Sequence, residues 1–213
     1  MTARPRILGK ASSINVRKVL WTCAEIGLDP VREDWGAGFA DTAAPEFLAL
    51  NPNGLVPVLV EADGARVLWE SNTICRYLAA AHGRADLLPA DPWGRAQVER
   101  WMDWQATELN GAWRPAFMGL VRRDPAFADP GAIAASLAAW NARMAILDAQ
   151  LAATGAYVAG PGFTLADIVL GLSANRWLMT PMPARPAFPA VSAWLARLDA
   201  RPGWRAHGAN GIP

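Results

Sequence analysis

The residues best suited to chemistry flank a short predicted hairpin, in Val56-Pro57 and Glu70-Ser71. Proline cannot donate to a sheet ladder, so Pro57 is expected at a strand start or edge, which leaves the Val56 backbone free to pair with a ligand. Ser71 is a good N-cap for a following helix, whose N-terminus attracts anions, and Glu70 beside it offers a carboxylate. These groups suit an extended peptide that carries a free amine and a free carboxylate.

A small α/β unit is expected to hold these groups in place. Apolar runs over residues 4–8, 31–35, 56–60 and 65–69 predict four strands, and the last two are joined by a turn at Asp63-Gly64. Helical spacing predicts helices over residues 16–27, 44–50 and 71–82, the first ending at Gly27. The order β-α-β-α-β-β-α predicts a small mixed sheet with helices on its faces.

The composition and the predicted secondary structure change after this unit. Residues 84–92 are typical of a linker, and helical segments follow at about 92–119, 130–153, 164–180 and 188–200. We therefore predict two domains, over residues 1–83 and 93–213, the second all-helical. An apolar cleft between domains is a usual place for a ligand.

Composition argues against several classes of partner. The 20 basic and 19 acidic residues leave a net charge of +1, which gives no electrostatic case for binding nucleic acid or an anionic membrane. The N-terminus has no apolar signal region and no window approaches the ~20 apolar residues of a membrane span, so a cytoplasmic protein is expected. Cys23 and Cys75 form no paired motif, and with only His82 and His207 no metal site is expected.

Four motifs together resemble the cytosolic glutathione transferases over nearly the full chain, particularly the Ser-dependent bacterial, theta-like and delta-like members. They are the Ser-rich loop with Asn15-Val-Arg-Lys18, then Asn51-Pro-Asn-Gly-Leu-Val-Pro57, Trp69-Glu-Ser71 and Phe163-Thr-Leu-Ala-Asp167. The last is also a local signal for a helix start, with Thr164 as N-cap and Asp167 at the third position. The resemblance implies a thioredoxin-like N-terminal domain, an all-α C-terminal domain and glutathione as co-substrate.

The same resemblance implies how glutathione is held. Pro57 is expected to be a cis proline, Val56 to pair its backbone with the cysteinyl unit, and Glu70 and Ser71 to hold the γ-glutamyl end. The glycyl carboxylate lacks an obvious partner, because residues 36–55 contain no Lys, Arg or His.

Two neutral residues and one cation of this chain are candidates for that end of the ligand. Asn53 and Trp35 are neutral donors, and Lys10 or a residue of a partner subunit would supply charge. Asn72 stands where some relatives carry Arg after the Glu-Ser pair, so we include it among the glutathione-binding residues.

A donor at the start of the first helix is expected to stabilise the glutathione thiolate. A free thiol with a pKa of about 8.5 is only slightly ionised at neutral pH, so such a donor raises the concentration of the nucleophile. Ser13, four residues before Arg17, matches the catalytic Ser of the relatives; Asn15 and Ser12 are the alternatives. The three residues also suit simple capping of the helix, which is the structural alternative.

The electrophile is expected to bind the first helix after the linker. Its candidate residues are spaced to share roughly one face; they are Trp104, Glu108, Trp113, Arg114, Phe117 and Met118. If Arg114 faces the cleft, a polar or anionic second substrate is favoured.

Conjugation of an apolar electrophile is the leading function, and two alternatives stay open. One is a glutathione-dependent disulfide reductase or isomerase, although Ser13 cannot form a mixed disulfide as a Cys would. The other is a non-catalytic interaction module with the same fold. The resemblance also implies a homodimer.

Overall fold

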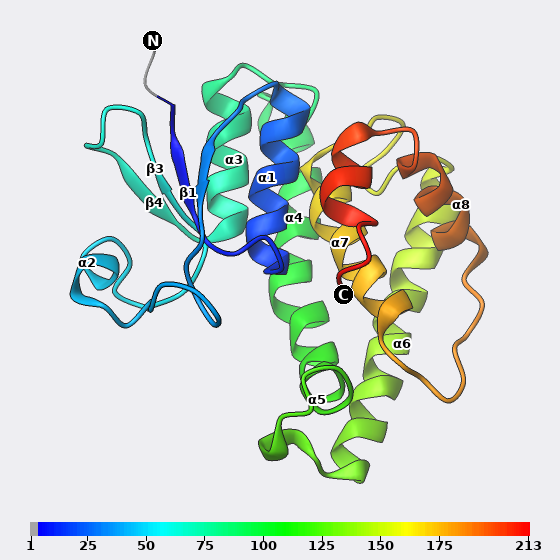
Figure 1. The fold of residues 1–213 in the computed structure, drawn as a ribbon. Helices are drawn as coiled ribbons and strands as arrows, with labels where there is room; N and C mark the ends of the chain where they lie inside the picture. Colours follow the sequence, from blue (N-terminus) through cyan, green and yellow to red (C-terminus); the bar gives the residue numbers. More distant parts are fainter. Residues whose placement is uncertain (1–3) are drawn as a thin grey trace.

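The computed structural model describes residues 4–213 and contains both predicted units (Figure 1). The prediction that the N-terminus has no apolar signal region includes residues 1–3, which lie outside the described residues. The predicted β-α-β-α-β-β-α order is confirmed. Its elements are β1 (Arg6–Leu8), α1 (Ile14–Ile26), β2 (Val31–Glu33), α2 (Pro45–Leu48), β3 (Val58–Val60), β4 (Val67–Trp69) and α3 (Ser71–Ala81).

The four strands form one mixed sheet in the order β2-β1-β3-β4. β1 runs parallel to β2 and antiparallel to β3, and β3 runs antiparallel to β4. In the last pair Val58 lies opposite Trp69, so the residues just outside the ladder, Pro57 and Glu70, become neighbours. The sheet therefore brings together two groups that are 13 positions apart in the chain.

The ends of two helices decide how the chain enters this region. Gly27 ends α1 in the left-handed conformation, with φ 72°, as predicted. The prediction that Ser71 caps α3 is wrong: Ser71 is the first helical residue and Glu70 is the N-cap, with φ 72° and ψ 109°. Because β4 ends at Trp69, the whole change of direction falls on Glu70.

The C-terminal unit is helical. Its elements are α4 (Pro92–Trp104), a π-helical segment η1 (Gln105–Leu109), α5 (Asn110–Leu120), the 3₁₀ turn η2 (Pro125–Phe127), α6 (Pro130–Thr154), α7 (Leu165–Met179), α8 (Pro189–Leu198) and the π-helical η3 (Trp204–Gly208). The single helix predicted over residues 92–119 is thus divided by a π-helical turn, a feature that often accompanies functional sites.

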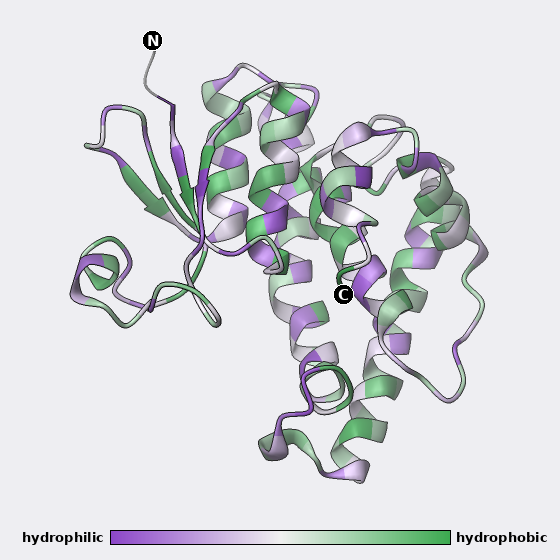
Figure 2. Ribbon diagram, viewed as in Figure 1, coloured by the Kyte–Doolittle hydropathy of each residue, from purple (hydrophilic) through white to green (hydrophobic). Residues whose placement is uncertain are grey.

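α7 passes through the centre of the molecule (Figures 1 and 2). It is buried from Leu165 to Trp177 and mostly apolar, as expected of a helix surrounded by others. Only four of those residues are polar or charged: Asp167, Ser173, Asn175 and Arg176. Each buried polar group of this helix therefore needs a local explanation.

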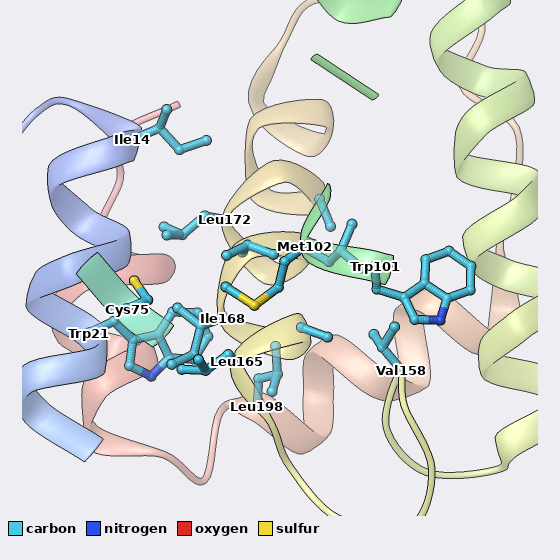
Figure 3. Packing of buried hydrophobic residues seen from close by; sticks show 14 of the residues in the cluster. Ile14, Trp21, Cys75, Trp101, Met102, Val158, Leu165, Ile168, Leu172 and Leu198 are labelled. Atoms are coloured by element: carbon cyan, nitrogen blue, oxygen red, sulfur yellow. The ribbon is translucent and has the colours of Figure 1, made fainter. Parts of the chain in front are cut away.

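One hydrophobic cluster joins the two units. Figure 3 shows Trp21 of α1 and Cys75 of α3 beside Ile168 of α7, with Met102 of α4 close by. Since apolar burial is continuous from the sheet-covering helices into α7, each unit depends on the other for part of its core. The boundaries at residues 83 and 93 stay predictions.

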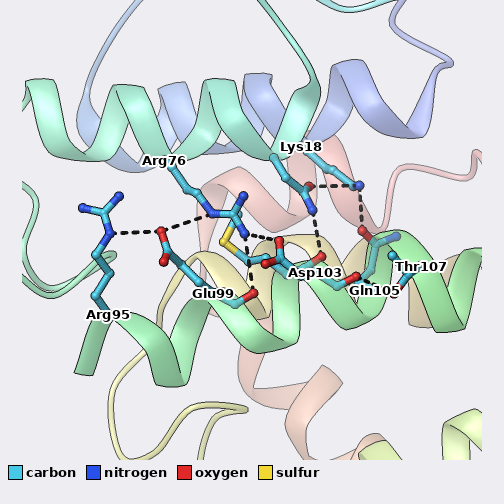
Figure 4. A network of polar contacts seen from close by, with 9 residues as sticks. Lys18, Arg76, Arg95, Glu99, Asp103, Gln105 and Thr107 are labelled. Atoms are coloured by element: carbon cyan, nitrogen blue, oxygen red, sulfur yellow. Dashed lines mark hydrogen bonds and ion pairs between the residues drawn. The ribbon is translucent and has the colours of Figure 1, made fainter. Parts of the chain in front are cut away.

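A buried polar network crosses the same junction (Figure 4). The Lys18 ammonium, 2% exposed, donates to Asn72 Oδ1 at 3.2 Å and to Gln105 Oε1 at 2.8 Å. The Asn72 amide nitrogen in turn donates to the Met102 carbonyl at 2.8 Å. These bonds tie α1, α3 and the start of η1 together.

Lys18 is expected to make stability depend on pH. Burial lowers its pKa to about 8 from the ordinary 10.5, so between these values the unfolded chain binds more protons than the folded one. Stability from this group therefore rises with pH across that window. Between pH 8 and 9, the free energy of unfolding should rise by about 1 kcal/mol more for wild type than for Lys18→Met, as measured by denaturant unfolding. Identical pH profiles for the two proteins would contradict this.

Candidate active site

A cavity of about 760 Å³ opens between the two units. One wall comes from the loop between β1 and α1, the start of α1 and the residues just before β3. The opposite wall comes from η1, α5 and one residue of α7. This volume lies within the usual range for small-molecule sites, roughly 300–1,000 Å³.

The start of α1 offers an unused hydroxyl to this cavity. Ser13 is the N-cap of α1, yet its side chain makes no capping hydrogen bond. Both Ser13 and Asn15 line the cavity, and Ser12 is absent from its lining. The alternative that the Ser13 side chain only caps the helix is therefore not supported, because that side chain makes no capping hydrogen bond.

Gly9 brings this loop against the segment before β3. Its φ is 149°, and a Cβ there would lie 2.5 Å from Val16 Cγ2 and 3.0 Å from Val56 Cβ. Only glycine permits so close an approach. The start of α1 and the Val56 backbone consequently flank one space.

The Val56-Pro57 peptide bond is cis, as predicted. Val56 lines the cavity, whereas Pro57, Glu70 and Ser71 do not. Ser71 is 6% exposed in the first turn of α3, and Glu70 is held at a positive φ that is rare outside glycine. Such backbone outliers cluster at functional sites, where surrounding structure maintains them.

The proposed neutral donors for the glycyl end are turned elsewhere. The Asn53 amide groups, backbone and side chain, both donate to Asn51 Oδ1, at 3.1 and 3.0 Å. Trp35 Nε1 points to Glu33 Oε2 at 3.5 Å. Neither Asn53 nor Trp35 lines the cavity, but Lys10 does.

Three further candidates lie outside the cavity lining. The amide oxygen and nitrogen of Asn72 both make hydrogen bonds within the polar network. The Trp104 ring packs edge-on against that of Trp101, with centroids 5.3 Å apart. The Glu108 carboxylate pairs with the Arg143 guanidinium at 3.0 Å. The prediction assumed uninterrupted α-helical spacing. Even in a regular helix, however, Trp104 and Trp113 are nine residues and about two and a half turns apart, so they face opposite ways. The π-helical turn η1 does reach the cavity, but through Ala106 and Thr107 rather than Glu108.

The candidates after η1 do line the cavity; they are Trp113, Arg114, Phe117 and Met118. The Trp113 and Phe117 rings meet edge to face with centroids 5.4 Å apart. Trp113 is fixed further by its Nε1, which donates to Asn110 Oδ1 at 2.9 Å. This pair gives the helical wall a rigid aromatic surface.

Two charged cavity residues were missed by the sequence analysis, Arg122 and Arg176. Arg176 is 3% exposed, and its guanidinium carbon lies 4.5 Å from the Trp113 centroid and 4.1 Å from that of Phe117. Burial, with help from the neighbouring cations, lowers its pKa to about 9. The available signal was an arginine within the mostly apolar run that forms α7.

Metal clusters and membrane-spanning helices are two features that the described residues do not show. Residues 4–213 contain no group of three His, Cys, Asp or Glu side chains placed to hold a metal ion. Within the same range, none of the helices combines the length and apolar character needed to cross a membrane.

Comparison with known proteins assigns the family. The models for the glutathione S-transferase N-terminal and C-terminal domains match residues 12–81 and 115–202. The chain belongs to the glutathione S-transferase family, as the motifs predicted.

Two relatives and one solved structure show that the similarity extends over nearly the whole chain. GstB of Escherichia coli is 39% identical over 92% of this chain and 94% of its own, and glutathione S-transferase 3 of Zea mays is 35% identical over 94% and 91%. The glutathione-bound theta class enzyme of Xanthomonas axonopodis pv. citri is 40% identical, covers both chains completely and superposes with a TM-score of 0.90.

Proposed function

We propose that this protein is a glutathione transferase that conjugates glutathione to a small electrophile. The observation that carries the proposal is the shared cavity, with a free hydroxyl at the start of α1 on one wall and an aromatic surface on the other. The first wall suits a thiolate and the second a carbon electrophile. Its relatives carry the same activity in their names.

Ser13 is the proposed thiolate donor. Ser13 lines the cavity at the positive end of the α1 dipole, and its side chain makes no capping hydrogen bond. A hydrogen bond there favours the thiolate over the thiol and leaves the sulfur free to attack. Asn15, on the same wall, is the second candidate, whereas Ser12 lies outside the cavity lining and is not proposed as the donor.

Glutathione is proposed to lie along the first wall. The Val56 backbone, on this wall, pairs with its cysteinyl unit. Glu70 and Ser71 lie outside the cavity lining, at the β4–α3 junction beside Pro57, and hold the γ-glutamyl end through charge and the α3 N-terminus. Lys10 is the proposed partner of the glycyl carboxylate, because it is the cation on this wall. Its Nζ already lies there, donating to the Ala37 carbonyl at 2.9 Å.

Calorimetric titration with glutathione tests this arrangement. Lys10→Met is expected to weaken binding about tenfold, since a charge-assisted hydrogen bond to a carboxylate is lost. Arg66→Met, on the β3-β4 hairpin and outside the cavity, is the control and should bind as wild type does. Equal affinity of the Lys10 variant would remove Lys10 from the site.

The rival functions predict different results in this titration and in assays of turnover. Absence of binding at millimolar glutathione would favour an interaction module. Binding with turnover of disulfides, but not of electrophiles, would favour a glutathione-dependent reductase. A cytoplasmic location and a homodimer, with the N-terminal unit of one subunit against the helical unit of the other, complete the proposal by analogy with the family.

A further inference from the structure

The cavity carries an excess of positive charge. Four cations line it, Lys10, Arg114, Arg122 and Arg176, and among the described residues its lining contains no Asp or Glu. Lys10 stands on the glutathione wall. The three arginines stand on the helical wall, where the electrophile is proposed to bind.

Arg176 is the buried member of this group. Within residues 4–213 it forms no ion pair, and its Nε is buried without a hydrogen-bond partner. Other buried or half-buried arginines differ in their terminal nitrogens: Arg201 pairs with Glu25 at 2.6 Å. Arg17 also has an unpartnered buried Nε, but its terminal nitrogens donate to the carbonyls of Ile212 and Pro213 at 2.8 and 3.0 Å. What Arg176 does contact is the faces of Trp113 and Phe117.

This arrangement is costly without a ligand. A buried cation needs an anion or several acceptors to offset lost hydration, and ring faces supply only part of that. With a pKa of about 9, Arg176 is still protonated at neutral pH. The nearby Arg17 and Arg122 add repulsion, which an anion in the cavity would relieve.

We propose that the electrophile is a small anion, with a carboxylate bound by Arg176 and a planar reacting group against Trp113, the more exposed of the two rings. This inference rests on the proposed transferase function. The exposed Arg114 and Arg122 at the same wall raise the local concentration of anions. A bidentate guanidinium would fix the orientation of the carboxylate, and the Trp113 ring, held by Phe117 behind it, would fix the plane of the reacting carbon.

The chemical step for an aryl halide balances without any further reactant. The glutathione sulfur forms a bond to the ring carbon, and the halide leaves with the electron pair of the carbon–halogen bond. The thiol proton passes to solvent when the thiolate forms. Arg176 touches only the carboxylate and takes no part in the exchange.

A matched pair of electrophiles tests the proposal: 4-chloro-3-nitrobenzoate and its uncharged amide, 4-chloro-3-nitrobenzamide. For each, kcat/KM is divided by the rate constant of the uncatalysed reaction with glutathione, which removes the difference in intrinsic reactivity. Wild type is expected to favour the anion about tenfold or more, the usual effect of a charge-assisted hydrogen bond. Arg176→Met should abolish the preference through KM for the anion, and Arg176→Lys should restore part of it.

Arg100→Met is the control, because Arg100 also lies over a Trp ring, that of Trp101 at 5.8 Å, but outside the cavity. It should keep the preference of wild type. Thermal melting of each variant confirms that it is folded. No preference in wild type, or a preference that survives Arg176→Met, would overturn the proposal. So would an Arg176→Met variant whose main defect is weaker glutathione binding, which would assign Arg176 to the tripeptide instead.

A binding measurement separates this inference from the proposed function. The unreactive 3-nitrobenzoate and 3-nitrobenzamide are titrated into wild type and Arg176→Met by calorimetry, with no chemistry required. Tighter binding of the benzoate to wild type, lost in the variant, supports the anion site even if neither chlorinated compound is turned over. Equal binding of both compounds to wild type rejects the anion site whether or not the protein is a transferase.

Discussion

Replacing Ser13 by alanine should lower kcat for conjugation about 10²-fold while leaving the affinity for glutathione nearly unchanged. The Ser13 hydroxyl has no capping bond to lose, so the change removes a donor from the cavity and little else. A donor to sulfur strengthens as charge develops on it, and its loss is therefore felt in turnover rather than in binding. Steady-state kinetics with a saturating electrophile measures the effect.

Ser12→Ala is the matched control for that experiment. It removes the same hydroxyl one position earlier, from a residue outside the cavity lining, and should leave kcat near the wild-type value. Unchanged turnover in Ser13→Ala would remove Ser13 from the mechanism. A large loss in Asn15→Ala would then assign the donor role to Asn15.

Replacing Asp167 by alanine should destabilise the fold by about 3–5 kcal/mol. Its fully buried carboxylate accepts from Val158 N–H at 2.9 Å, Thr164 N–H at 2.8 Å, the Thr164 hydroxyl at 3.1 Å and Trp194 Nε1 at 2.9 Å. Removing the acceptor leaves those donors buried without partners, which costs more than the bonds themselves contribute. The loss falls on the junction of α7, α8 and the loop before α7.

Urea denaturation measures this difference, with Asp129→Ala as the control. Asp129 is an exposed N-cap of α6 that accepts only from Ala132 N–H, at 2.6 Å, so its loss should cost about 1 kcal/mol. If Asp167→Ala cost no more than Asp129→Ala, the burial and bonding of Asp167 would not explain the helix start at Thr164.

Most of the fold could be predicted because its local signals agree with one another. Gly27 ends α1, the turn at residues 63–64 joins β3 to β4, and the Thr164 and Asp167 pair begins α7, each as expected from its own few residues. The exceptions are set by neighbours distant in the chain. Glu70 replaces Ser71 as the α3 cap because the pairing of β4 with β3 extends to Trp69.

The site was only partly predictable for the same reason. Short-range motifs led to Ser13, Asn15 and Val56, which do line one cavity. The expected shared face failed for Trp104 and Glu108, because Trp104 lies about two and a half helical turns from Trp113. Trp104 packs on Trp101 instead, and Glu108 pairs with Arg143.

Arg176 illustrates a different limit of the sequence. It lies on α7, about 60 residues after Trp113 and Phe117, and only the tertiary arrangement of α7 and α5 around the cavity places its guanidinium over their rings. Asn72 shows the converse. This residue lies within a predicted binding motif, but it accepts a hydrogen bond from Lys18, which is distant in the sequence and which no local pattern could reveal.

The central claim is that the start of α1 stabilises a glutathione thiolate, and the thiol pKa of bound glutathione tests it most directly. Ultraviolet absorbance of the thiolate is followed against pH for the wild-type complex and for Ser13→Ala. The account predicts a pKa well below the free value of about 8.5 in wild type, moving back toward that value in the variant. Bound glutathione that titrates like the free thiol in both proteins would contradict it.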